Sequence, residues 1–325
     1  MGGSLPPRIS GTPADAAGPA DAAALTADGV AVRAWTPHGQ APDIAAAMAA
    51  RSAGENFPVA LRLLPARHRR HLMAVYGFAR TADDIGDKAP AAERGRLLDE
   101  LEADLGRLYA SIGRGAAAGR GPELSVIRAL GPAVTQCAIP QQPFRDLIQA
   151  NRQDQLVARY PAFDDLQDYC RLSANPVGRI VLCVFGAFSP ARAELSDQVC
   201  TALQLAEHWQ DVGEDFRAGR IYLPGEDMAR YDCPESDLAA PRSSPALQAL
   251  IAFETGRARA LLDAGAPLVG TLRGFARAAV AGYVAGGRAA LAAIAAADHD
   301  VLRGTPRPAA RRTAAELIRA YATGR

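Results

Sequence analysis

Apolar residues recur with a helical period along most of the chain. Leu97, Leu101, Leu105 and Leu108 follow one another at intervals of four, four and three positions. A helix places residues with this spacing on one face. Strand signals are weak, because threonines, β-branched clusters and alternating patterns are few. The pattern therefore predicts helices almost throughout, from about residue 43 onward.

Breaks in this pattern divide the chain into helical segments. Stretches containing glycine or proline fall at residues 113–121, 139–143, 189–190 and 233–245, and such residues end helices. About ten helices fit between the breaks, and no shift in composition marks a second domain. We therefore expect residues 43–325 to form one all-α domain, a single bundle of long helices around a central cavity.

Two further segments differ from the rest. Residues 1–42 are rich in Ala, Gly, Pro and Asp, which predicts a disordered or weakly ordered leader rather than a signal peptide. Residues 278–297 come closest to the ~20 apolar residues that cross a bilayer. Arg288 and several glycines interrupt them, so we expect a buried core helix there.

Composition narrows the class of protein. The chain has 325 residues, of which 49% are hydrophobic and 22% charged, and its net charge is +1. These values exclude a disordered chain, and they lack the basic excess of a nucleic-acid-binding protein. Lys88 is the only lysine and follows Asp87, so the phosphate-binding loop GxxxxGK[ST] is absent. Five isolated cysteines indicate reduced thiols in a cytosolic protein.

A first acidic cluster ends an apolar helical segment. Asp83, Asp84 and Asp87 follow residues 72–80, and a helix places Asp83 and Asp87 one turn apart on the same face. Like charges at this spacing repel, and the C-terminal end of a helix disfavours anions. A divalent cation removes both penalties. Oxygen ligands without His or Cys indicate Mg²⁺ or Mn²⁺ rather than zinc.

A second acidic cluster lies in residues 204–215. A continuous helix places Gln204, His208, Asp211 and Asp215 on one face, at intervals of four, three and four. One DxxxD pair alone is ordinary on a solvated helix. Two such pairs, each embedded in apolar and aromatic residues, instead predict two facing acidic helices. Such helices would bind Mg²⁺ and a prenyl diphosphate, which is a polyanion with an apolar tail.

These motifs together resemble the squalene/phytoene synthase family of head-to-head prenyl transferases, over about residues 50–305. Four segments carry the resemblance: Tyr76-x-x-x-Arg80-x-x-Asp83-Asp84-x-x-Asp87, Asp168-Tyr169-Cys170-Arg171, residues 204–215, and Arg220-x-Tyr222-x-Pro224. The resemblance implies an isoprenoid synthase fold and a Mg²⁺-diphosphate site, in which Mn²⁺ is the alternative ion.

Within the family, three segments resemble the bacterial hydroxysqualene synthases of hopanoid biosynthesis. They are residues 55–60 (ENFPVA), 173–179 (SANPVGR) and 208–211 (HWQD). This branch releases diphosphate from presqualene diphosphate and ends the reaction with water, so no NADPH is expected. One position departs from the family, because Glu207 stands where Asn is common. It adds a charge beside the expected metal-binding helix, and its role stays open.

The acidic clusters and the resemblance together assign three sets of site residues. The expected metal ligands are Asp83, Asp84, Asp87, Asp211, Glu214 and Asp215. The expected substrate-binding residues are Glu55, Asn56, Phe57, Arg80, Arg220 and Tyr222. The expected catalytic residues are Tyr76, Tyr169, Asn175, His208 and Gln210.

Structural roles compete with several of these assignments. Arg80 either clamps a diphosphate or pairs with Asp84 one turn away, and the two roles are compatible. Tyr169 is either catalytic or an ordinary core residue beside a helix that Pro176 ends or kinks. His208 either helps to hold the attacking water or is a buried histidine with satisfied hydrogen bonds.

The leading interpretation is a hydroxysqualene synthase. The alternatives are a presqualene diphosphate, squalene or phytoene synthase and, in another class, a non-catalytic helical scaffold. Expected partners are presqualene diphosphate or farnesyl diphosphate, and other hopanoid-pathway enzymes, but no nucleic acid. We expect the protein in the cytoplasm, touching the inner face of the membrane through an apolar patch at the mouth of its cavity.

Overall fold

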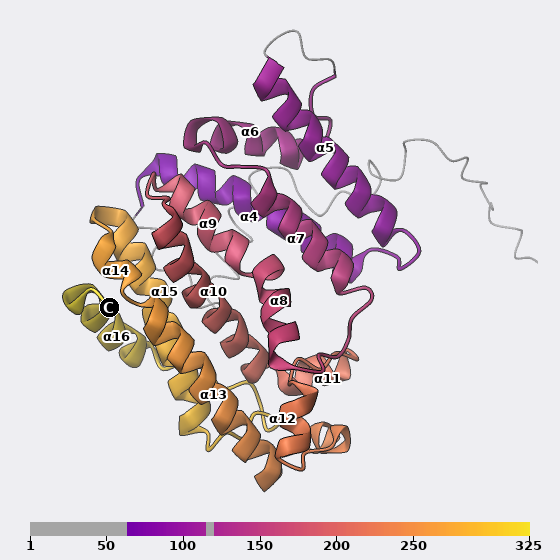
Figure 1. The fold of residues 1–325 in the computed structure, drawn as a ribbon, viewed down its shortest axis with the longest axis vertical. Helices are drawn as coiled ribbons and strands as arrows, with labels where there is room; N and C mark the ends of the chain where they lie inside the picture. The colour runs from indigo at the N-terminus through magenta and orange to yellow at the C-terminus, as the bar shows by residue number, and fades with distance from the viewer. Residues whose placement is uncertain (1–63, 115–119) are drawn as a thin grey trace, which may run out of the picture. The chain divides into compact units, whose positions relative to one another are not determined.

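The computed structural model describes residues 64–114 and 120–325. These residues form thirteen α-helices and one short 3₁₀ helix, joined by turns and loops (Figure 1). This part of the chain contains no β-strand, and its one β-bridge joins Arg159 to Ile221. The expectation of an all-α fold is confirmed. The predicted leader, residues 1–42, and three predicted site residues, Glu55, Asn56 and Phe57, lie outside the described residues.

The helices have the following bounds: α4 Ala66–Lys88, α5 Arg94–Arg114, α6 Ser125–Cys137, α7 Gln142–Gln153, α8 Phe163–Ser173, α9 Asn175–Val184, α10 Pro190–Gln210, α11 Val212–Arg217, α12 Gly225–Arg230, η2 Glu235–Ala239, α13 Pro245–Gly265, α14 Leu268–Thr271, α15 Gly274–Ala296 and α16 Ala310–Thr323. The breaks between them agree with those predicted at residues 139–143, 189–190 and 233–245. The three shortest α-helices, α11, α12 and α14, were not anticipated by the sequence pattern, because four to six residues are too few to show a period.

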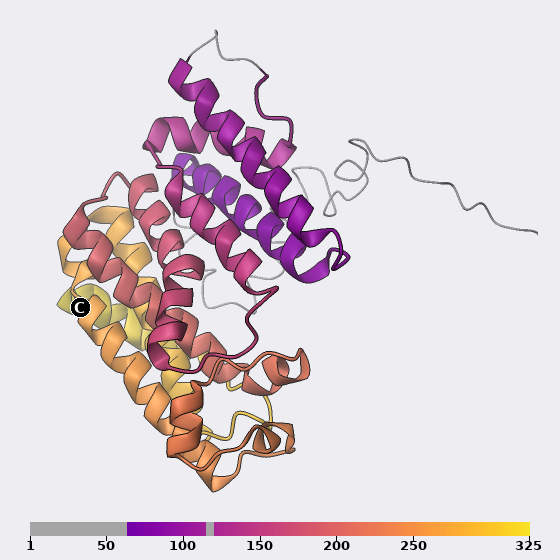
Figure 2. The same cartoon turned by 45° about the vertical axis from the view of Figure 1, so that its right-hand side comes forward.

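Helix α10 forms the centre of the bundle. It packs against α9, α13 and α15, as both views show (Figures 1 and 2). Its residues Leu205 and Trp209 are fully buried. A Cβ atom at Gly287 of α15 would lie 2.7 Å from the Leu203 side chain, so the missing side chain lets α15 approach α10 closely. On the other side of the bundle, α4 packs against α5, α6 and α7.

The predicted apolar faces are buried as expected. The leucine stripe of α5, from Leu97 to Leu108, is at most 5% exposed. The apolar run at residues 278–297 forms most of α15, and within the described residues α15 alone is long and apolar enough to cross a membrane. Two thirds of its most apolar window is buried inside the bundle, at 67%. The helix therefore serves as a core element, as predicted.

Two helix boundaries determine where polar groups point. Ala174 separates α8 from α9, and Pro176 lies in the first turn of α9, where its missing N–H is not needed. The predicted break at Pro176 is confirmed. The predicted continuous helix over residues 204–215 is wrong in one detail, because α10 ends at Gln210 and α11 begins at Val212. Asp211 leaves the helical conformation, with φ −107° and ψ 14°, and Gly213, a poor helix former, follows.

Candidate active site

The C-terminal half of α4 carries five of the predicted site residues. Asp84 turns toward the cations of its own helix, at 2.6 Å from Arg80 and 2.8 Å from Lys88. The intrahelical pair weighed for Arg80 is therefore present, and Asp84 is neutralised within α4. Asp83 and Asp87 retain solvent access. Tyr76 is half-buried, one turn before Arg80.

Asp83 contacts α7 rather than a cation. The side-chain amide of Asn151 donates a hydrogen bond to Asp83 Oδ1 at 3.2 Å. Desolvation raises the pKa of Asp83, the bond from Asn151 lowers it in part, and the nearby charge of Asp87 raises it further. The carboxylate is exposed to water, and its raised pKa shows that an added cation would stabilise its charged form.

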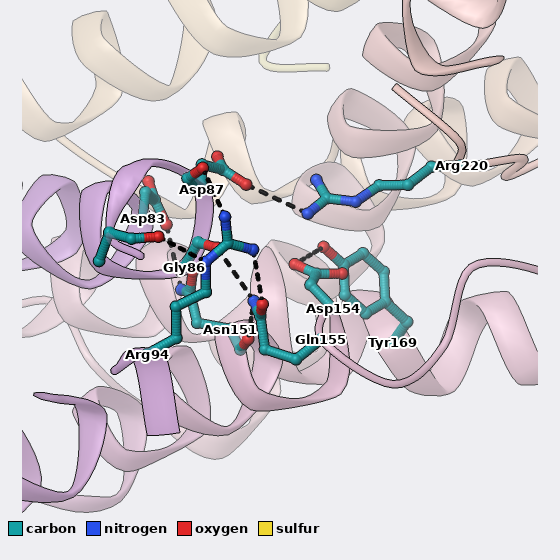
Figure 3. Close-up of polar contacts among 10 residues, drawn as sticks. Asp83, Gly86, Asp87, Arg94, Asn151, Asp154, Gln155, Tyr169 and Arg220 are labelled. Atoms are coloured by element: carbon teal, nitrogen blue, oxygen red, sulfur yellow. Dashed lines mark hydrogen bonds and ion pairs between the residues drawn. The ribbon is translucent and has the colours of Figure 1, made fainter. Parts of the chain in front are cut away.

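A network of hydrogen bonds fixes the last turn of α4 (Figure 3). Gln155 donates to the carbonyl of Gly86 at 3.1 Å. Arg94 donates to the carbonyl of Asp87 at 3.0 Å and to Gln155 at 2.8 Å. A Cβ atom at Gly86 would lie 2.4 Å from the side-chain oxygen of Asn151. Glycine is thus required here for α7 to approach and for Asn151 to reach Asp83.

Asp154, at the C-terminal end of α7, is a site residue that the sequence analysis missed. The hydroxyl of Tyr169 donates to its Oδ2 at 3.0 Å (Figure 3). Its Oδ1 is buried and has no hydrogen-bond partner among the described residues. Burial raises the pKa of Asp154 to about 6; Tyr169 and Arg220 work against this rise, and Asp87 and Asp83 add to it. No motif marks Asp154, since it stands among polar residues that resemble an ordinary helix end.

Backbone pairing brings two tyrosines together beside Asp154. Ile221 N–H donates to the carbonyl of Ala158 at 2.9 Å, and Gly225 N–H donates to the carbonyl of Tyr160 at 2.8 Å. The rings of Tyr160 and Tyr222 consequently stack, with centroids 5.7 Å apart and an interplanar angle of 19°. Burial raises the pKa of Tyr222, and the charge of Asp154 adds to this effect. Tyr222 therefore stays a neutral donor.

His208 stacks on the other side of this aromatic group. Its ring lies 3.7 Å from that of Tyr222, at an angle of 16°. Its Nε2 is 3.1 Å from the side-chain nitrogen of Gln204, and its Nδ1 is 3.9 Å from Asp215 Oδ2. The histidine is buried and has a polar neighbour at each ring nitrogen. A structural and a catalytic role are both compatible with this environment.

A small recess opens between this aromatic group and the second acidic cluster. His208, Asp215, Arg220 and Tyr222 line it together with apolar residues, and its volume is about 10 Å³. A cavity of this size holds about one water molecule. The recess can therefore hold a water molecule, and it is too small for a prenyl chain.

Arg220 connects the two acidic clusters. Arg220 follows α11 in the chain, and its guanidinium lies 3.1 Å from Asp87 of α4 (Figure 3). Burial would lower its pKa, but Tyr222, Asp154 and Asp87 raise it well above the ordinary value. The cation is thus permanent. It lines the recess beside the second cluster and contacts Asp87 of the first.

The segment between α15 and α16 covers part of the second acidic cluster. The hydroxyl of Thr305 lies 3.3 Å from Asp211 Oδ1 and 3.3 Å from Glu214 Oε1, and its single hydrogen can satisfy one of them at a time. The pKa of Asp211 is raised, first by desolvation and then by Glu214 and Asp215. Gln210 donates its side-chain amide to the carbonyl of Pro306.

Two predicted catalytic residues contact other parts of the fold than the aromatic group. Gln210 is buried, and its side-chain amide donates to the carbonyl of Pro306 in the segment between α15 and α16. Asn175, also buried, accepts a hydrogen bond from the hydroxyl of Thr201 at 2.9 Å, which ties α9 to α10. The structure therefore brings together Tyr169, His208, Arg220 and Tyr222, and it gives Asn175 and Gln210 interhelical contacts.

The carboxylates fit a divalent cation by chemistry but do not form a complete cage. Within residues 64–114 and 120–325, no three His, Cys, Asp or Glu side chains lie close enough to hold a metal ion by themselves. Mg²⁺ is commonly bound by one or two carboxylates and by the phosphates of a substrate. Two all-oxygen clusters with raised pKa values at Asp83 and Asp211 match that mode of binding.

Comparison with known proteins agrees with the geometry. The family model for squalene/phytoene synthase matches residues 50–314. A hydroxysqualene synthase from Rhodopseudomonas palustris is 37% identical over 68% of this chain and 72% of its own length. A 15-cis-phytoene synthase from Synechococcus elongatus is 33% identical over 63% of this chain and 68% of its own. The crystal structure of squalene synthase HpnC from Alicyclobacillus acidocaldarius superimposes with a TM-score of 0.70 and 38% identity, over 79% of this chain and 95% of that one.

Proposed function

Because the chain belongs to the squalene/phytoene synthase family, we propose that it is a hydroxysqualene synthase. It converts presqualene diphosphate and water into hydroxysqualene and diphosphate. One observation carries the proposal: a buried histidine and two tyrosines meet a carboxyl group beside both acidic clusters. Such a site can bind a diphosphate at one end and hold a water molecule at the other.

The acidic clusters supply the metal-binding end. Asp83 and Asp87 of α4 and Asp211 and Asp215 of the second cluster are the proposed ligands, with Asp84 and Glu214 in support. These carboxylates would hold Mg²⁺ or Mn²⁺, which would supply positive charge to neutralise the leaving diphosphate. Asp84 contributes less directly, because Arg80 and Lys88 already pair with it.

Arg220, Arg80 and Tyr222 bind the diphosphate oxygens. Arg220 is held by Asp87 through a single 3.1 Å contact, which leaves guanidinium donors for a phosphate. Tyr222 keeps its proton and can donate it in a hydrogen bond. Arg220 and Tyr222 line the recess, so they would hold the leaving group at its mouth.

Water ends the reaction on the aromatic side of the recess. After diphosphate leaves, the carbocation must lose a proton, receive hydride or react with water. Gln204 and His208 offer polar groups 3.1 Å from each other, so they can orient a water molecule toward the cation. The added water releases one proton, which His208 can accept at Nε2 when that nitrogen exchanges its contact with Gln204 for one with the water. Tyr169, held by Asp154, shapes the adjoining wall.

The decisive experiment supplies presqualene diphosphate and Mg²⁺ without NADPH, in ¹⁸O-labelled water. The proposal expects hydroxysqualene with the label in its hydroxyl group, in an amount that NADPH does not change. A hydrocarbon product, or a requirement for NADPH, would indicate a squalene synthase instead. Product formed from farnesyl diphosphate alone would indicate a presqualene diphosphate synthase, and no metal-dependent diphosphate release would indicate a scaffold.

The proposed function also implies where the protein acts. The substrate and the product are strongly apolar, so the protein would act in the cytoplasm at the inner face of the membrane. Other hopanoid-pathway enzymes are candidate partners, because they would supply presqualene diphosphate or consume hydroxysqualene.

A further inference from the structure

The outward face of α16 combines apolar and cationic side chains. Ile318 is 71% exposed and Tyr321 is 46% exposed, and the other exposed apolar positions of the helix are alanines. Arg311, Arg312 and Arg319 are also exposed. The one carboxylate of α16, Glu316, is only 18% exposed and lies 4.0 Å from an arginine. This face therefore presents positive charge around an apolar stripe.

The inner face holds α16 firmly on the bundle. Ala320 is fully buried and Leu317 packs against the core. Arg277 of α15 donates to the carbonyl of Tyr321, and its guanidinium lies 4.9 Å from the centre of the Tyr321 ring. A Cβ atom at Gly270 would lie 2.9 Å from the Gly324 carbonyl oxygen. The helix is thus anchored on one side, and none of the described helices covers the opposite side (Figures 1 and 2).

Positive charge is concentrated in residues 301–325, which include α16. Residues 301–325 hold six of the 36 cationic residues and one of the 35 acidic residues, although the whole chain carries a net charge of only +1. The partner that fits such a face is anionic. An amphipathic helix with arginines beside an apolar stripe is typical of helices that lie in the surface of a membrane.

We propose that the outward face of α16 docks on the surface of a membrane containing anionic lipids. Ile318 would enter the boundary between headgroups and acyl chains, the exposed edge of the Tyr321 ring would lie beside it, and the arginines would bind the headgroups. A groove on a protein partner is less suited to this face, because such grooves need large anchor side chains at successive turns. Here alanines occupy most of those positions. The surface differs from the patch at the cavity mouth that the sequence predicted.

Vesicle sedimentation without substrate tests the proposal independently of the reaction proposed above. The full chain should bind vesicles that contain phosphatidylglycerol and dissociate in high salt. It should bind pure phosphatidylcholine far more weakly. Arg311→Gln and Arg312→Gln should each weaken binding about fivefold, whereas Arg128→Gln, at an exposed position of α6, should leave binding unchanged.

A second pair of variants tests the apolar stripe. Ile318→Glu should abolish binding, and the matched Ile112→Glu on α5, also exposed, should not. Melting temperatures of all variants should match the unmodified chain, since the altered side chains are exposed. A Tyr321→Trp variant gives an independent reading, because brominated lipids should quench its fluorescence. Absence of binding to anionic vesicles would overturn the proposal, and so would binding that the α16 variants leave intact.

Discussion

The hydroxyl of Tyr169 donates a hydrogen bond to Asp154 across 3.0 Å and so joins α8 to the end of α7. The second oxygen of the same carboxyl group is buried without a partner among the described residues. One donor for two buried oxygens is an incomplete arrangement for a charged group. The pKa of Asp154 accordingly rises to about 6, and the carboxyl group changes its charge near neutral pH.

This raised pKa predicts a pH dependence of stability. The folded pKa, about 6, lies above the ordinary value of 3.8, so between these values the folded state binds more protons than the unfolded state. The contribution of Asp154 is therefore lost as pH rises through this window, by about 3 kcal/mol at most. Asp154→Asn should make the melting temperature less dependent on pH between 4 and 7. Asp164→Asn, at an exposed position of α8, should keep the original dependence, and an Asp154→Asn profile parallel to the unmodified one would contradict the prediction.

A second prediction concerns the two acidic clusters. Asp83→Asn and Asp211→Asn should each reduce diphosphate release at least roughly 100-fold, because each removes a charge that would face the bound cation. Neither should lower the melting temperature, since both carboxylates carry raised pKa values in the free protein. Asp164→Asn again serves as the control for a lost surface charge. Near-native diphosphate release by either variant would rule out the proposed metal site.

Gly86 and Asn151 should behave as a coupled pair. A Cβ at Gly86 would meet the Asn151 side-chain oxygen at 2.4 Å, so Gly86→Ala should cost about 1–3 kcal/mol in the free energy of unfolding. In the double variant with Asn151→Ala, the clash disappears and the cost should be smaller than the sum of the single costs. Urea denaturation measures all four proteins of this cycle. Strictly additive effects would show that the close contact does not exist.

The environment of His208 predicts a change of product rather than a loss of ionisation. His208→Phe keeps a ring that can stack on Tyr222 but removes the polar contacts to Gln204 and Asp215. Diphosphate release should persist within about tenfold, while hydroxysqualene gives way to elimination products or rearranged alcohols. Gln204→Leu, which removes one of those contacts, should shift the product in the same direction but less. An unchanged product ratio in His208→Phe would assign the histidine a structural role.

The sequence predicted those parts of the site that local patterns encode. Helical spacing identified the carboxylates of α4, and the apolar flanks of both clusters indicated that they face the interior. The structure differs on the second point, because Asp83, Asp87 and Glu214 are exposed. Arg220, from beyond α11, nevertheless contacts Asp87 in α4. Pro176 and the other breaks were also recognisable, because proline and glycine affect the backbone at their own positions.

Contacts between distant segments were not predictable in the same way. Asn151 binds Asp83 across 68 positions of sequence, and nothing in its neighbourhood indicates that partner. Asp154 likewise becomes unusual only through burial beside Tyr169. The break between α10 and α11 at Asp211 was not predicted for a related reason. Its spacing suits a helix, whereas a bent conformation is favoured by the following glycine and by contacts with residues near 305.

The contact of Thr305 with Asp211 has a consequence for the biosynthesis of the protein. The two residues are 94 positions apart, and Gln210 and Pro306 are separated by 96. The second acidic cluster therefore cannot be completed on the ribosome until residues 305 and 306 have emerged. A polypeptide released before residue 305 could bury much of its helical core, yet it would leave this cluster uncovered. The residues that cover this cluster are thus synthesised only after all the helices from α4 to α15.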